Sequence, residues 1–152
     1  MTDTETQTST GLFDPNDPAH AKALDKLEHD LIAWFTTIAA NGQPHSVPVW
    51  FLWHDGTLLV MSEPHTAKVK HVRAGSPVLM HLEGGEFGND VVVLNGTAEI
   101  SDRPAVDWLP ELREVYSEKY AAAIADYGMP VEALFEKFST MMVFRPAKLM
   151  AW

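Results

Sequence analysis

The sequence contains no cysteine. A chain without thiols has no disulfides, and thiolate catalysis, zinc–thiolate sites and iron–sulfur clusters are excluded with them. No serine lies in a Gly-x-Ser-x-Gly context, and neither a Gly-x-Gly-x-x-Gly motif nor a Walker loop is present. The sequence therefore offers no recognisable nucleophile elbow, no glycine-rich dinucleotide site and no P-loop.

Positive charge and long apolar runs are also scarce. Eleven Lys and Arg residues stand against 21 Asp and Glu residues, for a formal net charge of -10. Because phosphate neutralisation dominates affinity for nucleic acids, such a chain is a poor nucleic-acid binder. No apolar run approaches the roughly 18 residues of a membrane span, and the N-terminus lacks the pattern of a signal peptide. We therefore expect a cytoplasmic protein without a nucleic-acid partner or a membrane span.

The histidines do not predict a metal site. Five of the seven histidines follow the first expected helix, namely His45, His54, His65, His71 and His81. They fall in different expected elements and form no His-x-His or His-Glu-x-x-His spacing. We expect no bound metal.

Hydrophobic residues make up 46% of the 152 residues, including five Trp and seven Phe. This is enough for one domain with a substantial core, and the chain is too short for two ordinary domains. Residues 1–18 differ from the rest, because they are rich in Thr and acidic residues and carry two Pro in turn-like contexts. We predict a flexible arm over 1–18 and one folded domain over 19–152.

Apolar patterning predicts a mainly β (α+β) domain with three or four helices at its ends. A helix is expected over 19–30, and about six strands are expected over 31–40, 44–53, 57–62, 77–83, 91–100 and 140–152. Asn41-Gly42 and Asp55-Gly56 predict tight hairpins, and Pro48 predicts an edge strand or a bulge. The short links and the absence of a βαβ repeat favour an antiparallel barrel or a strongly curled sheet.

The strongest candidate for a binding site lies between residues 50 and 73. After the hairpin, Pro64 ends a strand and Thr66 can cap a short helix. This helix holds most of the local positive charge, on Lys68, Lys70, His71 and Arg73. One interpretation is an anion site in which backbone N–H groups, a Thr hydroxyl and a Lys ammonium converge on a phosphate or carboxylate. The other is a solvated basic face of a surface helix.

The tryptophans are a second feature of interest. Trp50 and Trp53 are three residues apart in an expected strand, so their side chains point to opposite faces. One of them, or Trp152, could line a pocket or a subunit interface. The commoner alternative is that each fills the core beneath a helix.

The order of these motifs resembles a known family. The motifs are Gly42-x-Pro44-His45-Ser46-x-Pro48-Val49-Trp50-Phe51, then Thr66-Ala67-Lys68-Val69-Lys70-His71-Val72-Arg73, then Ser76-Pro77, and finally Asn95-Gly96-Thr97-Ala98-Glu99-Ile100. Together they are similar to the pyridoxamine 5'-phosphate oxidase-like split barrels. The resemblance is closest to the actinobacterial flavin/deazaflavin oxidoreductase branch that uses coenzyme F420, and it covers about residues 25 to 152.

The resemblance implies a six-stranded antiparallel split β-barrel with peripheral helices. It also implies a homodimer with two cofactor sites in the subunit interface. In these relatives the lysine that matches Lys68 contacts the cofactor phosphate, and Thr66 matches the neighbouring hydroxyl position. Lys70 and His71 would add positive charge for a polyanionic tail such as the F420 oligoglutamate.

The resemblance also implies which residues lie beside the rest of the cofactor. Met61 and Ser62 match the strand end that runs along it. Pro48, Val49 and Trp50 match the strand whose backbone faces the isoalloxazine or deazaflavin ring. Cofactor binding is therefore expected at the ends of two strands and at the start of the basic helix.

One departure from the family bears on the choice of cofactor. The oxidases that hold FMN carry Ser-Arg-Lys at this helix, whereas this chain has Thr66-Ala67-Lys68. A phosphodiester, as in F420, carries less charge than the phosphomonoester of FMN and suits a single lysine better.

The resemblance therefore implies an F420H2-dependent reductase that transfers hydride to an unsaturated or quinone-like small molecule. The alternatives are an FMN-dependent oxidase or reductase and a non-catalytic flavin- or deazaflavin-binding protein. Hydride leaves C5 of the reduced deazaflavin, so the protein contributes little acid–base chemistry, and no catalytic residue is assigned. His45, Trp50 and Trp152 are candidates to face the substrate.

Overall fold

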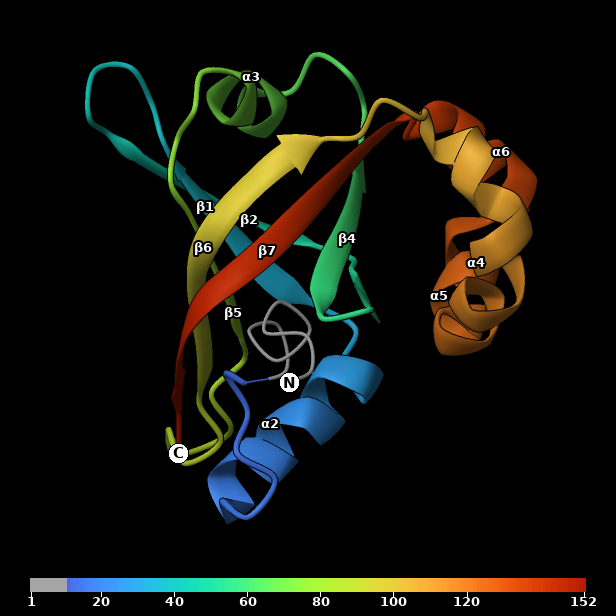
Figure 1. The fold of residues 1–152 in the computed structure, drawn as a ribbon. Helices are drawn as coiled ribbons and strands as arrows, with labels where there is room; N and C mark the ends of the chain where they lie inside the picture. The colour runs from blue at the N-terminus through green and yellow to red at the C-terminus, as the bar shows by residue number, and fades with distance from the viewer. Residues whose placement is uncertain (1–10) are drawn as a thin grey trace, which may run out of the picture.

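The computed structural model describes residues 11–152, which form a curled antiparallel sheet with helices around it (Figure 1). The strands follow the order β2-β1-β5-β6-β7-β4-β3. Their bounds are β1 Ala33–Ile38, β2 Pro44–Val49, β3 Leu52–His54, β4 Thr57–Ser62, β5 Val78–Leu82, β6 Val92–Ile100 and β7 Thr140–Ala151. Strands β2 and β3 are the two edges, yet only two residues separate them in the chain. The sheet must therefore curl until its edges come within about 11 Å of each other.

The sheet has seven strands, and the prediction of six is wrong because the expected strand over 44–53 is divided at Trp50-Phe51. The Phe51 N–H donates to the Tyr120 hydroxyl at 2.8 Å, and the Phe51 carbonyl accepts from Lys119 Nζ at 2.9 Å. Since side chains of a helix satisfy both backbone groups of Phe51, neither group needs a neighbouring strand. The chain passes from one edge of the sheet to the other at this corner.

One of the two predicted tight hairpins is confirmed. Asp55 and Gly56 both have positive φ, at 50° and 74°, as a two-residue turn between β3 and β4 requires. The prediction of the same turn at Asn41-Gly42 is wrong. There the Ala39 N–H donates to the carbonyl of Gln43, and of the pair Asn41-Gly42 only Gly42 has positive φ. The loop is therefore one residue longer, with the glycine in the left-handed position that such loops require.

Two positions modify the sheet ladder. Pro48 lies in the edge strand β2, which confirms that its missing N–H is accommodated at an edge. Strand β7 continues through Arg145-Pro146, but the register of β6 and β7 shifts between Asn95 and Gly96. A side chain at Gly96 would collide with the backbone of Arg145, so the close approach of the two strands requires glycine here.

Five helices lie in the described residues, where three or four are expected from the sequence. They are α2 Pro18–His29, α3 Ala67–Arg73, α4 Ala105–Lys119, α5 Ala121–Tyr127 and α6 Val131–Lys137. Figure 1 shows α3 at one end of the curled sheet, α2 across the other end, and α4, α5 and α6 grouped beside β4. None of the helices in residues 11–152 has the length and apolar character needed to cross a bilayer.

The buried side chains form two clusters with β7 between them. Met142 and Phe144 belong to the cluster inside the curled sheet, where Leu27 of α2 is fully buried. Met141 and Val143 belong to the cluster beneath α4–α6. The alternation follows from strand geometry, because successive side chains point to opposite faces. Both faces of β7 are thus covered, one by the barrel interior and the other by the helical group.

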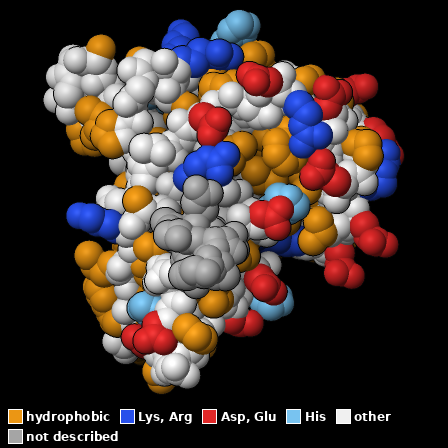
Figure 2. All heavy atoms as spheres, in the orientation of Figure 1, with side chains coloured by type: hydrophobic (Ala, Val, Ile, Leu, Met, Phe, Trp, Pro, Cys, Tyr) orange, Lys and Arg blue, Asp and Glu red, His pale blue; other side chains and the backbone are white. Residues whose placement is uncertain are grey.

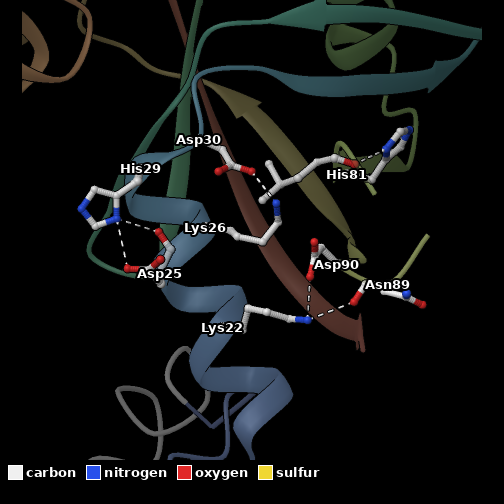
Figure 3. Close-up of polar contacts among 9 residues, drawn as sticks. Lys22, Asp25, Lys26, His29, Asp30, His81, Asn89 and Asp90 are labelled. Atoms are coloured by element: carbon white, nitrogen blue, oxygen red, sulfur yellow. Dashed lines mark hydrogen bonds and ion pairs between the residues drawn. The ribbon is translucent and has the colours of Figure 1, made fainter. Parts of the chain in front are cut away.

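Helix α2 is attached to the sheet mainly by apolar contacts. Ala23 and Leu27 are fully buried. Polar contacts at the helix surface are drawn in Figure 3, where Lys22 Nζ donates to the carbonyl of Asn89 and to Asp90 Oδ1 at 2.9 and 2.8 Å. Exposed ion pairs of this kind contribute at most about 1 kcal/mol to stability, so the buried apolar contacts are the main attachment of α2.

The first ten residues of the predicted arm over 1–18 lie outside the described residues. Within the remainder, Phe13 is buried, and its ring centroid lies 5.7 Å from that of Trp53. This side chain is part of the barrel core.

Candidate functional site

A cavity of about 480 Å³ lies between the end of β2, the end of β4, the start of α3 and the helical group α4–α6. Its volume falls within the range of typical small-molecule and cofactor sites, roughly 300–1,000 Å³. Figure 2 shows hydrophobic side chains gathered between the sheet and the helical group, with charged side chains of both signs around them. The lining residues are Pro48, Val49, Trp50, Met61, Ser62, Glu63, Thr66, Lys68, Tyr116, Tyr127, Leu134 and Phe138.

Seven of the nine residues expected from the sequence to bind a cofactor line this cavity. They are Pro48, Val49, Trp50, Met61, Ser62, Thr66 and Lys68. They come together because the two sheet edges meet at the Trp50-Phe51 corner and because α3 begins shortly after β4 ends. The cavity is therefore formed by elements that fix the barrel itself.

One wall of the cavity is aromatic. The Trp50 ring stacks on Tyr120 with centroids 4.7 Å apart and planes 8° apart. Tyr120 in turn contacts Tyr116 at 5.0 Å, and Tyr127 meets Trp50 edge-on at 6.4 Å. Stacked rings of this kind are held rigidly and present flat apolar surface, which suits a planar ligand.

The end of the cavity at α3 is polar and carries one unpaired cation. Lys68 is partly buried, and burial lowers the pKa of its ammonium while nearby Glu63 raises it in part. The ammonium has no hydrogen-bond or ion-pair partner in residues 11–152. Beside it, the hydroxyls of Ser62 and Thr66 lie 2.8 Å apart. A charged donor without an acceptor, next to two hydroxyls, can receive an anionic group.

Thr66 does not cap α3 with its side chain, so that part of the prediction is wrong. Its hydroxyl contacts Ser62 and donates to the carbonyl of Glu63 at 3.5 Å instead. The reason is that β4 ends only a few residues earlier, which places these acceptors closer than the first N–H groups of the helix. The Thr66 side chain therefore lines the cavity and does not bond to the first N–H groups of α3.

Lys70 and His71 do not line the cavity. Lys70 is exposed, because two residues along a helix turn the side chain by about 200° from Lys68. His71 points to β1, where its Nδ1 lies 2.7 Å from the Thr37 hydroxyl. His45 packs edge-on against His71 at 5.4 Å, and its buried Nδ1 has no partner in residues 11–152. Thr37, His45 and His71 therefore form a separate group of polar contacts between α3 and the sheet.

Of the tryptophans offered by the sequence as pocket residues, Trp50 lines the cavity. Trp53 packs against the barrel core, which confirms that the two side chains point to opposite faces. Trp152 is half exposed at the other end of the sheet, where its Nε1 donates to the carbonyl of Gly88 at 2.8 Å.

Five lining residues were not expected from the sequence: Glu63, Tyr116, Tyr127, Leu134 and Phe138. Four of them lie on or next to α4–α6, whose apolar residues predict helices but not the sheet face that those helices cover. Leu134 and Phe138 are four apart, so their spacing places them on one side of the chain. Glu63 directly follows Ser62, and this adjacency was the available signal for it.

A second hollow, of about 530 Å³, lies near the β3–β4 turn and the start of α4. Both of its arginines are paired with carboxylates, Arg103 with Glu111 at 3.1 Å and Arg145 with Glu99 at 2.9 Å. Over residues 11–152, no group of three or more potential metal-ligating side chains comes together. The cavity at Lys68 is therefore the stronger candidate site.

Comparison with known proteins identifies the family. A family model described as pyridoxamine 5'-phosphate oxidase matches residues 19–142. The search of curated protein sequences gives no match.

Three solved structures illustrate the shared fold. An F420 reductase is 20% identical, with a TM-score of 0.64 over 83% of this chain and 94% of that chain. The conserved hypothetical protein Rv2991 from Mycobacterium tuberculosis is 21% identical, with a TM-score of 0.68 over 87% and 82%. A putative pyridoxamine 5'-phosphate oxidase from Listeria innocua is 22% identical, with a TM-score of 0.60 over 86% and 95%. The family model covers most of the chain, and the protein belongs to the pyridoxamine 5'-phosphate oxidase family.

Proposed function

We propose that this protein is an F420H2-dependent oxidoreductase that reduces an unsaturated or quinone-like small molecule. The observation that carries the proposal is the cavity at Lys68, which combines a flat aromatic wall with a single unpaired cation at one end. An F420 reductase with the same fold supports the choice of cofactor.

The residues of the cavity fit the two ends of such a cofactor. Lys68 and the hydroxyls of Ser62 and Thr66 would hold the phosphate. Trp50 and the backbone at the end of β2 would lie along the ring. Because the unpaired ammonium is partly buried, the attraction of a bound anion would offset its existing desolvation cost.

When bound, the reduced deazaflavin supplies the hydride from C5. The protein's own contribution is to orient the ring, to place the acceptor against it and to exclude water. Burial raises the pKa of Tyr116 above its usual range, so this phenol stays protonated and neutral. Tyr116 can donate a hydrogen bond to an acceptor carbonyl but does not serve as a base at neutral pH.

Two alternatives use the same cavity. An FMN-dependent oxidase or reductase is favoured by the family itself, whose model carries the name of pyridoxamine 5'-phosphate oxidase. A non-catalytic flavin- or deazaflavin-binding protein would bind the cofactor without turnover, since a fold does not fix a function.

We also propose that the protein is a homodimer with the cofactor site near the subunit interface. Several large apolar side chains are exposed on the described chain, among them Tyr127 at the cavity and Met150 and Trp152 at the end of β7. Such surface is commonly covered by a second subunit. Sedimentation equilibrium is expected to give twice the chain mass, and a monomer at micromolar concentration would refute this assembly.

The experiment that tests the proposed function is a titration of cofactor-free protein with F420 and, separately, with FMN at fixed salt. Tryptophan quenching reports binding, and the change is expected to shrink in Trp50→Phe and to persist in Trp152→Phe. We expect micromolar or tighter binding of F420 and clearly weaker binding of FMN. Preference for FMN would support the flavin alternative, and binding of neither would overturn the oxidoreductase assignment.

A turnover assay distinguishes an enzyme from a non-catalytic flavin- or deazaflavin-binding protein. Reduced F420 is mixed with quinone acceptors, and its oxidation is followed by absorbance with and without protein. Tight binding without any acceleration across a panel of unsaturated and quinone acceptors would favour the non-catalytic alternative.

A further inference from the structure

We propose that Glu63 and Lys137 set how the phosphate end of the cavity discriminates between ligands of different charge: the Glu63 carboxylate disfavours a phosphomonoester relative to a phosphodiester, and the Lys137 ammonium opposes this effect. This inference rests on the proposed function, because it concerns the phosphate of a cofactor in the same cavity. Glu63 lines the cavity from the loop after β4, and Lys137 lies at the end of α6, next to the lining residue Phe138.

Glu63 is an unusual residue for the mouth of an anion site. It lines the cavity with Lys68, yet its carboxylate repels the anion that Lys68 attracts. Its Oε2 lies 2.9 Å from the Lys137 ammonium, the last residue of α6. The ion pair lowers the pKa of Glu63 and raises the pKa of Lys137, so both are charged at neutral pH.

The formal charge at this end of the cavity follows from these three groups. Lys68 and Lys137 contribute two positive charges and Glu63 one negative charge, which leaves a net charge of one. A phosphodiester carries one negative charge and is matched by it. A phosphomonoester carries close to two near neutral pH, so a charge added to or removed from the site changes its affinity more than that of the diester.

The helical group takes part in this selection because Lys137 lies outside the barrel. Without its ammonium, the negative charge of Glu63 would act unopposed on Lys68, which it already influences electrostatically. Lys137 therefore offsets part of the effect of Glu63 at the cavity. Phe138, the next residue after Lys137, lines the cavity, so the ion pair lies at its border.

The test uses three deazaflavin probes that share one ring and side chain and differ only in the phosphate. One lacks phosphate, one carries a phosphomonoester, and one carries the methyl phosphodiester. Affinities are measured at low salt for the wild type and for Glu63→Gln, Lys137→Gln and Glu132→Gln. The last variant is the matched control, since Glu132 also lies on α6 and pairs with Arg113 but does not line the cavity.

Each positive charge at this end of the cavity is expected to favour the doubly charged monoester over the singly charged diester, and each negative charge to do the reverse. If the two charges are taken to be about 6 Å apart in a water-like dielectric, one charge changes affinity by roughly threefold for each unit of ligand charge. Glu63→Gln is therefore expected to tighten the monoester about tenfold and the diester about threefold. Lys137→Gln is expected to weaken them in the same proportion, and neither variant should move the phosphate-free probe.

The outcomes distinguish failure of this inference from failure of the proposed function. If the probes bind but the ratio of monoester to diester affinity is the same in Glu63→Gln, Lys137→Gln and Glu132→Gln, the charge selection is refuted and the cofactor site stands. A parallel change for the phosphate-free probe also refutes it, because that indicates a general disturbance of the cavity. If no probe binds the wild type, the proposed function fails and this inference fails with it.

Discussion

The Tyr120 hydroxyl is the group on which the corner between β2 and β3 most depends. It accepts the Phe51 N–H at 2.8 Å and lies within donating distance of the carbonyls of Leu31 and Phe51, at 2.7 and 2.9 Å. Tyr120→Phe keeps the ring and its stacking on Trp50 but removes this oxygen. The buried Phe51 N–H is then left without an acceptor.

The expected cost follows from which groups lose their partners. A buried donor left unsatisfied costs about 1–3 kcal/mol, and the lost hydrogen bond to Leu31 adds about 1 kcal/mol. The Phe51 carbonyl keeps the Lys119 ammonium at 2.9 Å and adds little. We therefore expect Tyr120→Phe to lower the free energy of unfolding by about 2–4 kcal/mol. For a chain of this length, Tm should fall by roughly 4–16 °C.

Urea denaturation followed by circular dichroism measures this loss, with an unchanged dependence on urea concentration as the sign of two-state behaviour. Tyr116→Phe is the matched control, because Tyr116 lies one helical turn earlier on the same side of α4 and its hydroxyl has no partner in residues 11–152. The control should lose less than about 1 kcal/mol. Equal losses in the two variants would refute the role of the hydroxyl at the corner.

Three further changes test other parts of the fold. Burial lowers the pKa of Lys119 to about 8, below the 10.5 of an exposed lysine. Between those values the unfolded chain binds more protons, so this lysine makes the free energy of unfolding rise with pH. Urea denaturation at several pH values should show a smaller rise in Lys119→Met. Gly96→Ala forces a Cβ against the backbone of Arg145 and should cost about 1–3 kcal/mol by thermal denaturation, and wild-type stability would contradict the close approach. Leu27→Ala opens a cavity in the barrel core and should cost about 2–5 kcal/mol, whereas a loss below 1 kcal/mol by urea denaturation would argue against the docking of α2.

The parts of the fold predicted correctly are those that local sequence controls. Asp55-Gly56 gives a two-residue turn because both positions favour positive φ, and β2 is an edge strand because Pro48 has no N–H to donate. Helix α2 begins one residue before the predicted start. In each case the residues at that position in the sequence determine the local structure.

The parts that were missed depend on residues far apart in the chain. The break at Phe51 is stabilised by Lys119 and Tyr120, which are more than 60 residues away in the sequence. The residue pattern within 44–53 does not predict this break. The same applies to the helical wall of the cavity, because apolar spacing predicts a helix but not its packing partner. Lys70 was grouped with Lys68 by its position in the sequence, and only the helical rotation separates them.

The measurement that tests the central claim most directly is the F420 affinity of Lys68→Met beside that of Lys70→Met. Both variants remove one positive charge from α3, but only Lys68 lines the cavity. A charge-assisted hydrogen bond contributes about 1.5–3 kcal/mol, so we expect Kd to rise about 10- to 100-fold in Lys68→Met. Lys70→Met should change Kd by less than about threefold, as expected for an exposed charge. An unchanged Kd in Lys68→Met, or the same loss in both variants, would contradict the assignment of this cavity as the cofactor site.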